Sequence, residues 1–200
     1  YENEFLPAVK ADKAGRAAAV QAEIQFVKDR KADTHRLSDL AAAGQLPLRV
    51  THNDTKLNNV LFDATAGEAI CVIDLDTVMP GLAHYDFGDS IRFGANTAAE
   101  DEADLSKVSL DLEYFGAYAK GFLSQAGESL TQTEIDQLAF SAKLMTFECG
   151  MRFLTDYLNG DTYFKTAYPE HNLVRARNQF ALVADMERKM DQMEALIAAL

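Results

Sequence analysis

Three short apolar runs, set between two long stretches of helical pattern, constrain the fold of this chain more than any other feature. The runs are PLRVT at 47–51, NVLFD at 59–63 and AICVIDLD at 69–76. Each has the length and composition of a β-strand, and the five residues ATAGE between the last two form a Gly-containing connection that is typical of a hairpin. We therefore predict an α+β fold that is mainly helical, with a small β-hairpin region near its centre.

The first helical stretch covers residues 16–43, where apolar side chains recur at helical spacing. The polar run KDRKADTHR at 28–36 interrupts this spacing and indicates either a turn or a solvated helix face. Gly44 follows as a helix stop, and Pro47 begins the connection to the first apolar run. The sequence thus predicts helical structure that ends just before the β region.

The second helical stretch begins at residue 97. Thr97 with Glu100, and Thr131 with Glu134, each match the capping box, in which a side-chain oxygen and a carboxylate satisfy each other's orphan backbone N–H groups. The acidic run EDEAD at 100–104 is expected to form the solvated first turn of a helix, because carboxylates favour the positive end of the helix dipole. Both boxes therefore predict helix starts.

The last helical pattern is an apolar stripe with the spacing of a helix docked on a core. Its members are Val183, Met186, Met190, Met193, Ile197 and Leu200. A stripe so rich in methionine also suits an adaptable partner-binding surface, so that alternative stays open.

Composition excludes several classes of function. With 48% apolar and 25% charged residues, the 200 residues form one globular domain. A formal charge of −12 argues against nucleic acid as a partner. The chain has no run of eighteen apolar residues and no leader pattern, so we expect a cytoplasmic protein without a membrane partner. Cys71 and Cys149 lack metal-ligand spacing and are expected to be buried thiols.

Polar residues crowd the segment THNDTKLNNVLFD at 51–63, directly ahead of an expected strand. A hydrogen-bonded turn is one explanation, because Asn and Asp bond their own backbone. The other is catalytic: His52, Asp54 and Asn59 have the spacing H-x-D-x-x-x-x-N, and the hairpin then delivers Asp74. In phosphoryl transfer to a hydroxyl, an Asp orients the acceptor and takes its proton, while hard oxygen ligands hold magnesium. The loop, strand, turn and strand bring these groups together.

With these residues the chain resembles the kinase-like small-molecule phosphotransferases of the aminoglycoside phosphotransferase and choline kinase superfamily. Asn53 stands where protein kinases have Arg, Leu75-Asp76 follows the metal Asp in place of Phe-Gly, and no Ala-Pro-Glu segment follows. Within that superfamily, LPLRVTHNDTKLNNVLFD, CVIDLDTVMPGLAHYDFGDSIRFGANTA and LMTFECGMRFLTDYLNGDTYF are similar to the bacterial N-acetylhexosamine 1-kinases. The resemblance is strongest over 46–97 and 143–164.

The resemblance implies a role for each matching residue of the motif. Asp54 would be the catalytic base, Asn59 and Asp74 would hold Mg²⁺, and His52 would fix the loop. Lys56 would lie near the phosphate transferred from ATP, although a solvated loop lysine is the alternative.

Three further carboxylates follow the motif. Asp76 would either touch the metal or hold the turn before Pro80. In HYDFGDSIR, Asp86 and Asp89 are three residues apart, and we expect Asp86 to cap the next segment rather than contact a sugar.

The resemblance also implies that half of the kinase lies outside this chain. The sequence contains neither G-x-G-x-x-G nor a V-A-I-K-like strand, the elements that hold nucleotide phosphates in kinases. The chain begins at Tyr1 rather than Met, on helix-like sequence. We expect residues 1–200 to form the carboxy-terminal lobe, with the amino-terminal nucleotide-binding lobe belonging to the same polypeptide.

Arg152 is the candidate on the acceptor side. It continues an apolar helical stripe, and a cation at a position that the pattern would bury should have a partner or line a cavity. The stripe consists of Ile135, Leu138, Ala142, Met145 and Cys149. From the residues alone, a buried salt bridge and a ligand contact are equally good explanations. The resemblance favours sugar binding, with Tyr163 in the following NGDTYF loop as a companion.

Three classes of function remain for this chain. The first is the catalytic lobe of an ATP-dependent sugar kinase that phosphorylates a hydroxyl, the anomeric one if the resemblance holds, of an N-acetylhexosamine. The second is a related kinase for another acceptor, such as choline, an aminoglycoside or homoserine. The third is a kinase-like binding module without turnover. The identity of the hexosamine and the oligomeric state stay open.

Overall fold

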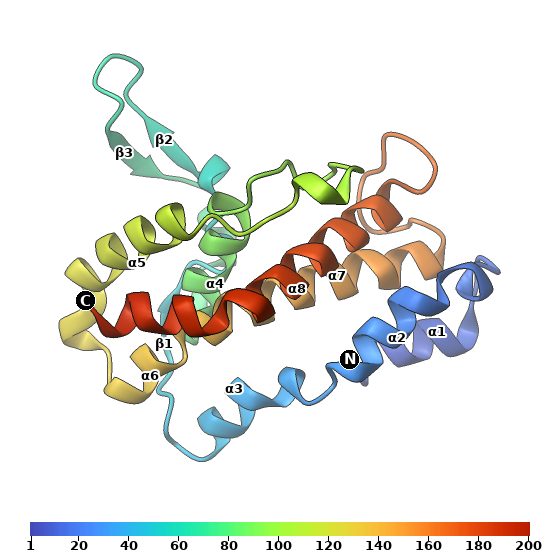
Figure 1. Ribbon diagram of the computed structural model, residues 1–200, viewed down its shortest axis with the longest axis horizontal. Coiled ribbons are helices and arrows are strands. Elements are labelled where there is room, and N and C mark those ends of the chain that lie inside the picture. The colour runs from blue at the N-terminus through green and yellow to red at the C-terminus, as the bar shows by residue number, and fades with distance from the viewer.

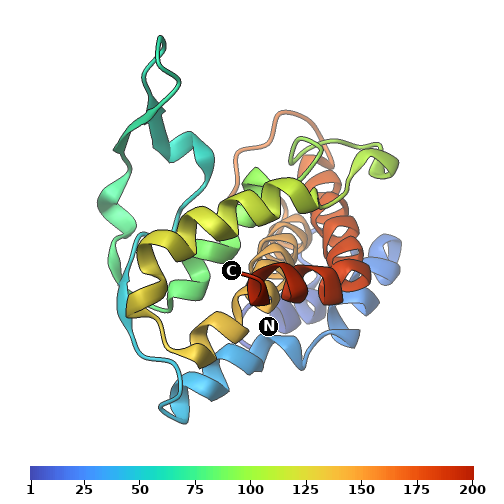
Figure 2. The ribbon, with the colours of Figure 1, turned by 60° about the vertical axis from the view of Figure 1, so that its left-hand side comes forward.

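The computed structural model describes residues 1–200 as a helical body from which one β-hairpin projects (Figures 1 and 2). The helices are α1 Phe5–Ala11, α2 Gln21–Asp29, α3 Asp33–Ala42, α4 Ala83–Gly94, α5 Leu112–Ala126, α6 Gln132–Asp136, α7 Leu138–Asn159 and α8 His171–Ala198. The strands are β1 Arg49–Thr51, β2 Val60–Phe62, β3 Ala69–Val72 and β4 Met79–Gly81. Short 3₁₀ turns cover Ala17–Val20, Leu57–Asn59, Leu75–Thr77, Leu105–Lys107 and Gly127–Ser129. The predicted fold class, α+β and mainly helical, is confirmed.

The strands form two separate antiparallel pairs. β2 and β3 make the predicted hairpin, with Val60 opposite Val72. β1 pairs instead with β4, so that Arg49 lies opposite Gly81. The three-residue strand β4 was not predicted, because its sequence, MPG, has no apolar alternation and contains Pro, which is depleted in strands. The β1–β4 ladder encloses the hairpin and holds both ends of the β region against the helical body.

Two long antiparallel helices, α7 and α8, lie side by side through the middle of the body (Figure 1). Buried residues lie on every side of α7, because α1, α4 and α8 all pack on it. At Gly88 of α4 an added Cβ would lie 2.5 Å from the Ser141 carbonyl oxygen of α7. Only glycine permits this close approach, which brings α4 and the β region that precedes it onto the body.

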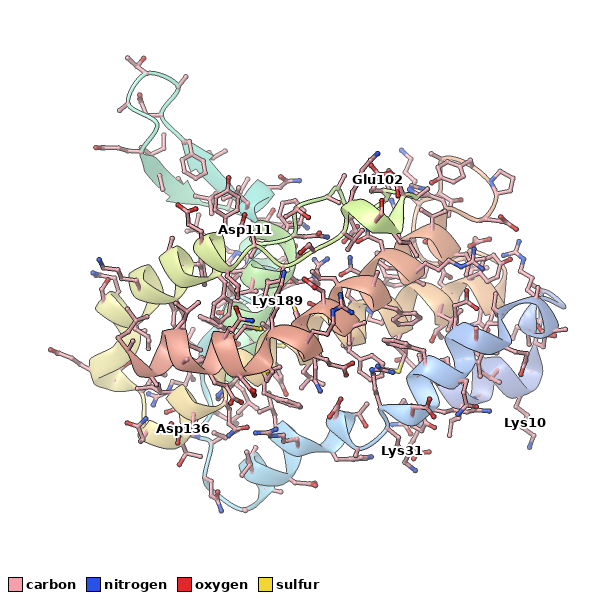
Figure 3. All side chains as sticks on the ribbon, viewed as in Figure 1. Lys10, Lys31, Glu102, Asp111, Asp136 and Lys189 are labelled. Carbon is pink, nitrogen blue, oxygen red and sulfur yellow. The ribbon has the colours of Figure 1, made fainter.

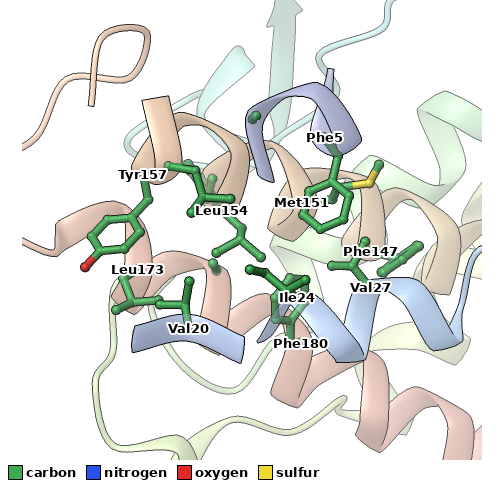
Figure 4. Packing of buried hydrophobic residues seen from close by; sticks show 14 of the residues in the cluster. Phe5, Val20, Ile24, Val27, Phe147, Met151, Leu154, Tyr157, Leu173 and Phe180 are labelled. Atoms are coloured by element: carbon green, nitrogen blue, oxygen red, sulfur yellow. The ribbon is translucent and has the colours of Figure 1, made fainter. Parts of the chain in front are cut away.

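The apolar core has two large clusters and one small one. The cluster in Figure 4 joins α1, α2, α7 and α8 through residues such as Phe5, Ile24, Leu154 and Phe180. A second cluster joins α4, α5, α7 and α8, with Phe87 in contact with the ring of Phe115. The third, beneath α3 and the start of β1, includes Leu37, Leu46 and Leu82. These clusters leave the hairpin outside the core.

Of the two explanations for the polar run within residues 16–43, a turn or a solvated helix face, the turn is the one that the structure has. Helix α2 ends at Asp29 and α3 begins at Asp33, within the polar run KDRKADTHR. Gly44 has a φ of 73°, in the left-handed region that L side chains rarely adopt, and follows the end of α3. The turn and the helix stop therefore lie where the sequence indicates them.

Of the two predicted capping boxes, one is confirmed and one is wrong. The Thr131 hydroxyl accepts from the Glu134 amide at 3.2 Å, and the Glu134 carboxylate accepts from the Thr131 amide at 2.7 Å. Thr97 instead exchanges backbone and hydroxyl hydrogen bonds with Ser109. Glu100 accepts from the buried Arg92 guanidinium at 2.6 Å. Residues 97–104 form turns, because these tertiary contacts outweigh the local helical signal.

The prediction of two buried thiols is wrong for Cys71, which is exposed on β3, and only partly right for Cys149. Every residue of β3 is exposed, since the hairpin projects beyond the body with both of its faces uncovered. Cys149 lies half-buried on α7, and desolvation raises the pKa of its thiol to about 12. Both thiols are free.

The stripe that ends at Arg152 begins with Ile135, half-buried on α6, is buried near the start of α7 and is exposed at its end. Leu138 and Ala142 are fully buried, Met145 and Cys149 are half-buried, and 44% of the Arg152 side chain is exposed. A stripe with a repeat of 3.5 residues turns by about 20° per heptad around an α-helix. Over the two heptads that end at Arg152 this drift is small, and Ser141, eleven residues earlier and on nearly the same side of α7 as Arg152, is fully buried. The difference is in what covers this side of the helix, which is packed near its start and faces cavities near Arg152. The expectation that Arg152 is buried is therefore wrong.

The α8 stripe packs on the body as predicted. Val183, Met186, Met193 and Ile197 are buried, whereas Leu200, beyond the helix end, is 57% exposed.

Charged side chains spread over the outer surface of the body, and Figure 3 labels Lys10, Lys31 and Asp136 among them. None of the helices has the length and apolar character needed to cross a membrane.

Candidate active site

The polar segment between β1 and β2 is a loop tied to helix α4. The Asp86 carboxylate accepts from the backbone amides of His52 at 2.8 Å and Asn53 at 2.7 Å. The Thr55 hydroxyl donates to the Asp86 carbonyl at 2.6 Å, and the Ser90 hydroxyl donates to the Thr55 carbonyl at 3.1 Å. The structural role expected of Asp86 agrees with these contacts, but the segment that it holds is the loop before it in sequence, not the one after.

The segment that follows β3 holds the same loop from the other side. The His52 Nε2 donates to the Ile73 carbonyl at 2.9 Å, and Nδ1 accepts from the Asp54 amide at 3.3 Å, which together match the Nε2–H tautomer. The Thr77 hydroxyl donates to the His52 carbonyl at 2.6 Å. The Asn53 side-chain amide donates to the Thr77 carbonyl at 3.0 Å. His52 therefore joins the two segments, as expected of a residue that fixes the loop.

Asn53 and Asp74, one in each segment, have left-handed backbone conformations, with φ values of 64° and 65°. Asn and Asp tolerate this region better than other residues with side chains, but it still costs free energy. Beneath the loop, a Cβ on Gly81 would collide with the Thr51 hydroxyl and crowd the Asn53 side-chain oxygen. A close-packed, partly strained backbone therefore sets where the loop side chains point.

Asp54, Lys56 and Asn59 form one hydrogen-bonded cluster. The Asp54 Oδ2 accepts from the Lys56 Nζ at 2.6 Å and from the Asn59 Nδ2 at 2.9 Å. The Asn59 Nδ2 also donates to the Asp54 carbonyl at 2.8 Å. Partial burial raises the pKa of Asp54, but the hydrogen bonds from Lys56 and Asn59 outweigh it, so the pKa lies below its usual value. Asp54 is therefore a carboxylate at neutral pH, and Lys56 is an ion-pair partner rather than a solvated lysine.

Asp74 follows the hairpin at the level of Asn59. The Ile73 amide donates to the Asn59 carbonyl at 2.9 Å, which places Asp74 one residue beyond a backbone contact with Asn59. Asp74 is exposed, whereas Asn59 is 6% exposed and its amide nitrogen is used by Asp54. The Asn59 side-chain oxygen and the Asp74 carboxylate thus remain as hard-oxygen donors at one edge of the loop.

These two donors fit a magnesium ion that completes its shell with other ligands. The chain has no cluster of three or more His, Cys, Asp or Glu that would hold a metal ion. Mg²⁺ is commonly bound through one or two protein oxygens together with substrate phosphates and water, so such a cluster is not required. The chemistry of the donor set is therefore compatible with magnesium held jointly with nucleotide phosphates.

Two cavities flank the loop. One, of about 400 Å³, lies beside α7, where Asn53 is the loop residue in its lining. Its other polar or aromatic lining residues are Tyr1, Thr34, Tyr85, Glu148 and Arg152, and apolar side chains of α7 complete it. The other, of about 340 Å³, lies between the loop, the hairpin and α5, with Lys56 and Tyr118 in its lining. The largest hollow, of about 590 Å³, lies among α5, α6 and α8, and none of the predicted site residues lines it.

Arg152 and Tyr163 lie together, at the edge of a further cavity of about 520 Å³. The Arg152 guanidinium lies 3.4 Å from the Tyr163 hydroxyl and over the rings of Tyr163 and Phe164, at 5.6 and 5.4 Å from their centroids. The ion pair of Arg152 is with Glu148, at 3.6 Å, and 44% and 42% of the two side chains are exposed. The alternative of a buried salt bridge is therefore wrong, and Arg152 lines cavities instead.

The loop that carries Tyr163 is held by Asp156, which sequence reasoning missed. The Asp156 carboxylate accepts from the amides of Thr162, Tyr163 and Phe164 at 2.9 to 3.0 Å, and it is 5% exposed. An Asp inside an otherwise apolar helical stretch was the available signal, because a buried carboxylate requires partners. Tyr85 and Glu148 gave no such signal, since their places in the lining of the cavity depend on how α4 and α7 approach the loop.

The two remaining aspartates differ in their surroundings. Asp89 is 9% exposed and accepts from the Arg92 Nε at 2.8 Å, so it belongs to a buried ion pair within α4. Asp76 is exposed in the 3₁₀ turn that follows Asp74, and it makes no side-chain hydrogen bond or ion pair. The expected role of holding the turn before Pro80 is therefore not supported, and a contact with the metal stays a prediction.

Comparison with known proteins gives two findings. Residues 1–120 match the model of a family described as "APH: Phosphotransferase enzyme family". The matched range includes the polar loop of residues 52–59 and Asp74 but ends before Arg152 and Tyr163. Among curated proteins, a 56-residue segment is 38% identical to Subtilisin-like protease 4 of Arthroderma gypseum, which is 28% of this chain and 14% of that protein. A match over so small a share of both chains carries no argument about activity.

Proposed function

The chain belongs to the APH phosphotransferase enzyme family, and we propose that it is the acceptor- and metal-binding lobe of an ATP-dependent sugar kinase. The observation that carries the proposal is the hydrogen-bonded cluster of Asp54, Lys56 and Asn59, with Asp74 one residue beyond a backbone contact with Asn59. In phosphoryl transfer the protein mainly positions reactants and neutralises charge. A base, a cation and two hard-oxygen donors at one loop are the groups that this task requires.

Asp54 would act as the base. A sugar hydroxyl that donates to its carboxylate is oriented for attack on the γ-phosphorus of ATP, and the proton passes to Asp54 as the new P–O bond forms. The bond from the γ-phosphorus to the bridging oxygen breaks, and ADP leaves. Because the pKa of Asp54 is low, the group is ionised before the acceptor arrives.

Lys56, Asn59 and Asp74 would act on the phosphate side. Lys56 is 33% exposed at its side chain and paired only with Asp54, so it can exchange that partner for a phosphate oxygen. Asn59 and Asp74 would hold Mg²⁺ through one amide and one carboxylate oxygen. Magnesium, when bound, neutralises charge on the nucleotide phosphates.

The acceptor would enter the 400 Å³ cavity beside α7, whose volume lies in the range of small-molecule sites. Tyr85, Glu148 and Arg152 supply polar groups to its lining, and Leu144, Met145 and Met151 supply apolar surface. This mixture suits an N-acetylhexosamine, which presents hydroxyls, an acetamide and apolar ring faces. Phosphorylation of its anomeric hydroxyl is the outcome that the sequence resemblance favours.

Nucleotide binding would be completed by an amino-terminal lobe of the same polypeptide. Exposed apolar side chains cover the hairpin and its base, among them Leu61 (46%), Ile70 (64%) and Leu75 (60%). A lobe packed on this surface would bury it and enclose ATP against Asp74. A kinase of small sugars with a charge of −12 requires neither nucleic acid nor a membrane as a partner, and we propose that the reaction takes place in the cytoplasm.

A kinase for a quaternary ammonium acceptor such as choline is the less favoured alternative. Such acceptors are recognised by the faces of aromatic rings. Near the acceptor cavities the rings of Tyr163 and Phe164 already face the Arg152 guanidinium. A second cation there would be repelled, so a neutral acceptor is favoured.

The test is Asp54→Asn in the complete polypeptide, assayed with ATP, magnesium and a panel of N-acetylhexosamines, choline and aminoglycosides. We expect turnover of one N-acetylhexosamine by the wild type and a loss of roughly 10²- to 10⁴-fold in the variant, the usual size of a general-base contribution. Asp39→Asn, at an exposed position of α3, is the matched control and should retain full turnover.

Two outcomes contradict the proposal. Near-wild-type turnover in the Asp54 variant would remove Asp54 from the role of base. A folded wild-type polypeptide with no turnover of any acceptor would favour the binding-module alternative.

A further inference from the structure

Glu148 is one of only two residues that line two cavities at once. The 400 Å³ cavity next to the catalytic loop and the 520 Å³ cavity next to Tyr163 have just two lining residues in common, Glu148 and Arg152. These lie one helical turn apart on α7, so their side chains project from the same face. A molecule that occupies both cavities would therefore contact both side chains.

Glu148 makes no contact that would give it a role in stabilising the fold. Its only partner is the Arg152 Nε at 3.6 Å, beyond hydrogen-bonding distance, and 42% of its side chain is exposed. Half-exposed ion pairs between residues four apart contribute little to stability. The carboxylate accepts no hydrogen bond from the protein, so its capacity as an acceptor is unused. Desolvation by the surrounding protein raises the pKa of Glu148, and Arg152 and Arg92 oppose that shift.

The pair offers complementary hydrogen-bonding groups. A guanidinium only donates and an ionised carboxylate only accepts, whereas each sugar hydroxyl does both. Neighbouring hydroxyls on a ring can therefore be satisfied by one such pair, with one hydroxyl accepting from Arg152 and another donating to Glu148. A cationic acceptor would gain from Glu148 but would be repelled by Arg152.

We propose that Glu148 is a specificity-determining residue of the acceptor site, whose carboxylate accepts a hydrogen bond from a hydroxyl of a neutral sugar. The inference rests on the proposed sugar-kinase function. It adds to that function a residue outside the matched family range, and it assigns the Glu148–Arg152 pair to recognition of the ring rather than to the reacting hydroxyl.

The experiment compares Glu148→Ala and Glu148→Gln with Glu194→Gln, an exposed control on α8, in the complete polypeptide. Each variant is assayed with ATP and the N-acetylhexosamine that the wild type phosphorylates. For Glu148→Ala we expect kcat/KM for the sugar to fall roughly 10- to 100-fold, the size of a hydrogen bond to a charged group. KM for ATP should stay within about twofold, and the melting temperature within about 2 °C, because a half-exposed pair adds little stability.

Deoxy sugars make the test specific to one hydroxyl. The acceptor panel includes versions of the sugar that each lack a single non-reacting hydroxyl, and also the free amine, glucosamine or galactosamine. If Glu148 binds one hydroxyl, the penalty of Glu148→Ala should vanish for the sugar that lacks it and persist for the others. Glu148→Gln, which keeps an acceptor oxygen but loses the charge, should give an intermediate loss.

Distinct outcomes separate this inference from the function on which it rests. If the wild type phosphorylates the sugar and the Glu148 variants show its normal kcat/KM, or lose only melting temperature, the assignment of Glu148 is wrong while the sugar kinase stands. Loss confined to the amine sugar shows that Glu148 reads a cation and overturns the neutral-hydroxyl assignment. A wild type without turnover of any N-acetylhexosamine overturns both.

Discussion

Helix α7 and the β2–β3 hairpin are both rich in apolar residues, yet these side chains are buried on the helix and exposed on the hairpin. Leu138, Leu154 and Leu158 of α7 are fully buried. On the hairpin, Ile70 is 64% exposed and Val72 is 53% exposed. The helix is stabilised by removing apolar surface from water, whereas the hairpin is held by its backbone ladder and by the polar contacts at its base. Apolar composition in a short run therefore does not indicate burial.

The same contrast explains where the candidate chemistry lies. Asp54, Asn59 and Asp74 lie where the hairpin leaves the body. The loop before the hairpin donates a hydrogen bond to Asp86 of α4 and accepts one from Thr77, in the segment after β3. At this boundary the buried apolar packing of the helical body ends, and hydrogen bonds hold the loop backbone instead. Three predictions test how different the two regions are.

The largest expected effect is on the helical body. Leu154→Ala removes a fully buried side chain from the core and should lower the free energy of unfolding by about 2–5 kcal/mol. Ile70→Ala, at a 64% exposed position of the hairpin, should change it by less than about 0.5 kcal/mol. Urea denaturation of both variants measures the difference. Both variants are made in residues 1–200, because the lobe proposed above would cover Ile70 in the complete polypeptide. Equal losses would mean that the hairpin is buried even without that lobe and would break the comparison.

The second effect concerns Glu134, which fastens β1 to the body. Its carboxylate accepts from the Arg49 guanidinium at 2.8 Å and from the Thr131 amide at 2.7 Å. The hydrogen bond from Arg49, together with those of the capping box, outweighs burial and lowers the pKa of Glu134 from 4.5 to about 2. Since the folded state binds this proton more weakly than the unfolded state, the contribution is present above about pH 4.5 and is lost as the pH falls toward 2.

This contribution amounts to at most about 3 kcal/mol, given 1.36 kcal/mol for each unit of pKa. We expect Glu134→Gln to be less stable than the wild type at pH 7 and the difference between the two to shrink as the pH falls from 4.5 to 2. Urea denaturation across that range measures it. A difference that does not change with pH would show that the charge of Glu134 contributes nothing.

The smallest of the three effects lies beneath the loop that carries Asp54. Gly81→Ala forces a Cβ against the Thr51 hydroxyl, so we expect a loss of about 1–3 kcal/mol of stability from overpacking. In the body, Gly121 of α5 has open space where the methyl group of an alanine would lie, and Gly121→Ala should stabilise the helix by about 0.5–1 kcal/mol. Thermal unfolding measures both variants: the melting temperature should fall for Gly81→Ala and rise for Gly121→Ala. Gly81→Ala should also lower turnover, because the loop that carries Asp54 must shift.

Local patterns predicted much of this fold. The hairpin, the break between α2 and α3, and the capping box of Thr131 all depend on residues within a few positions of one another. The strand β4 was missed because its partner, β1, lies about thirty residues earlier and its own sequence carries no strand pattern. The helix expected at Thr97 does not form, because its residues pair with Ser109 and Arg92.

In the candidate site, too, the features set by nearby residues were predicted and those set by the packing of distant elements were not. The spacing of Asp54 and Asn59 predicted two side chains that do meet, because both lie on one short loop. The hold of Asp86 on that loop, and the place of Glu148 between two cavities, depend on how separate helices pack and could not be read from spacing. The burial expected of Arg152 failed because the same side of α7 that is packed at Ser141 faces cavities at Arg152, and spacing does not show what covers a helix along its length.

The nested pairing of the strands has a consequence for the order of folding. The hairpin joins residues close in sequence, whereas the β1–β4 ladder must close a loop of roughly thirty residues at a larger entropic cost. Local hairpins form within microseconds, and non-local pairings form later. We therefore expect Asn59 and Asp74 to become neighbours early, while Asp54 joins them only when Arg49 reaches Gly81 and α4 docks. Acquisition of the complete site would then report the last stage of folding in this region.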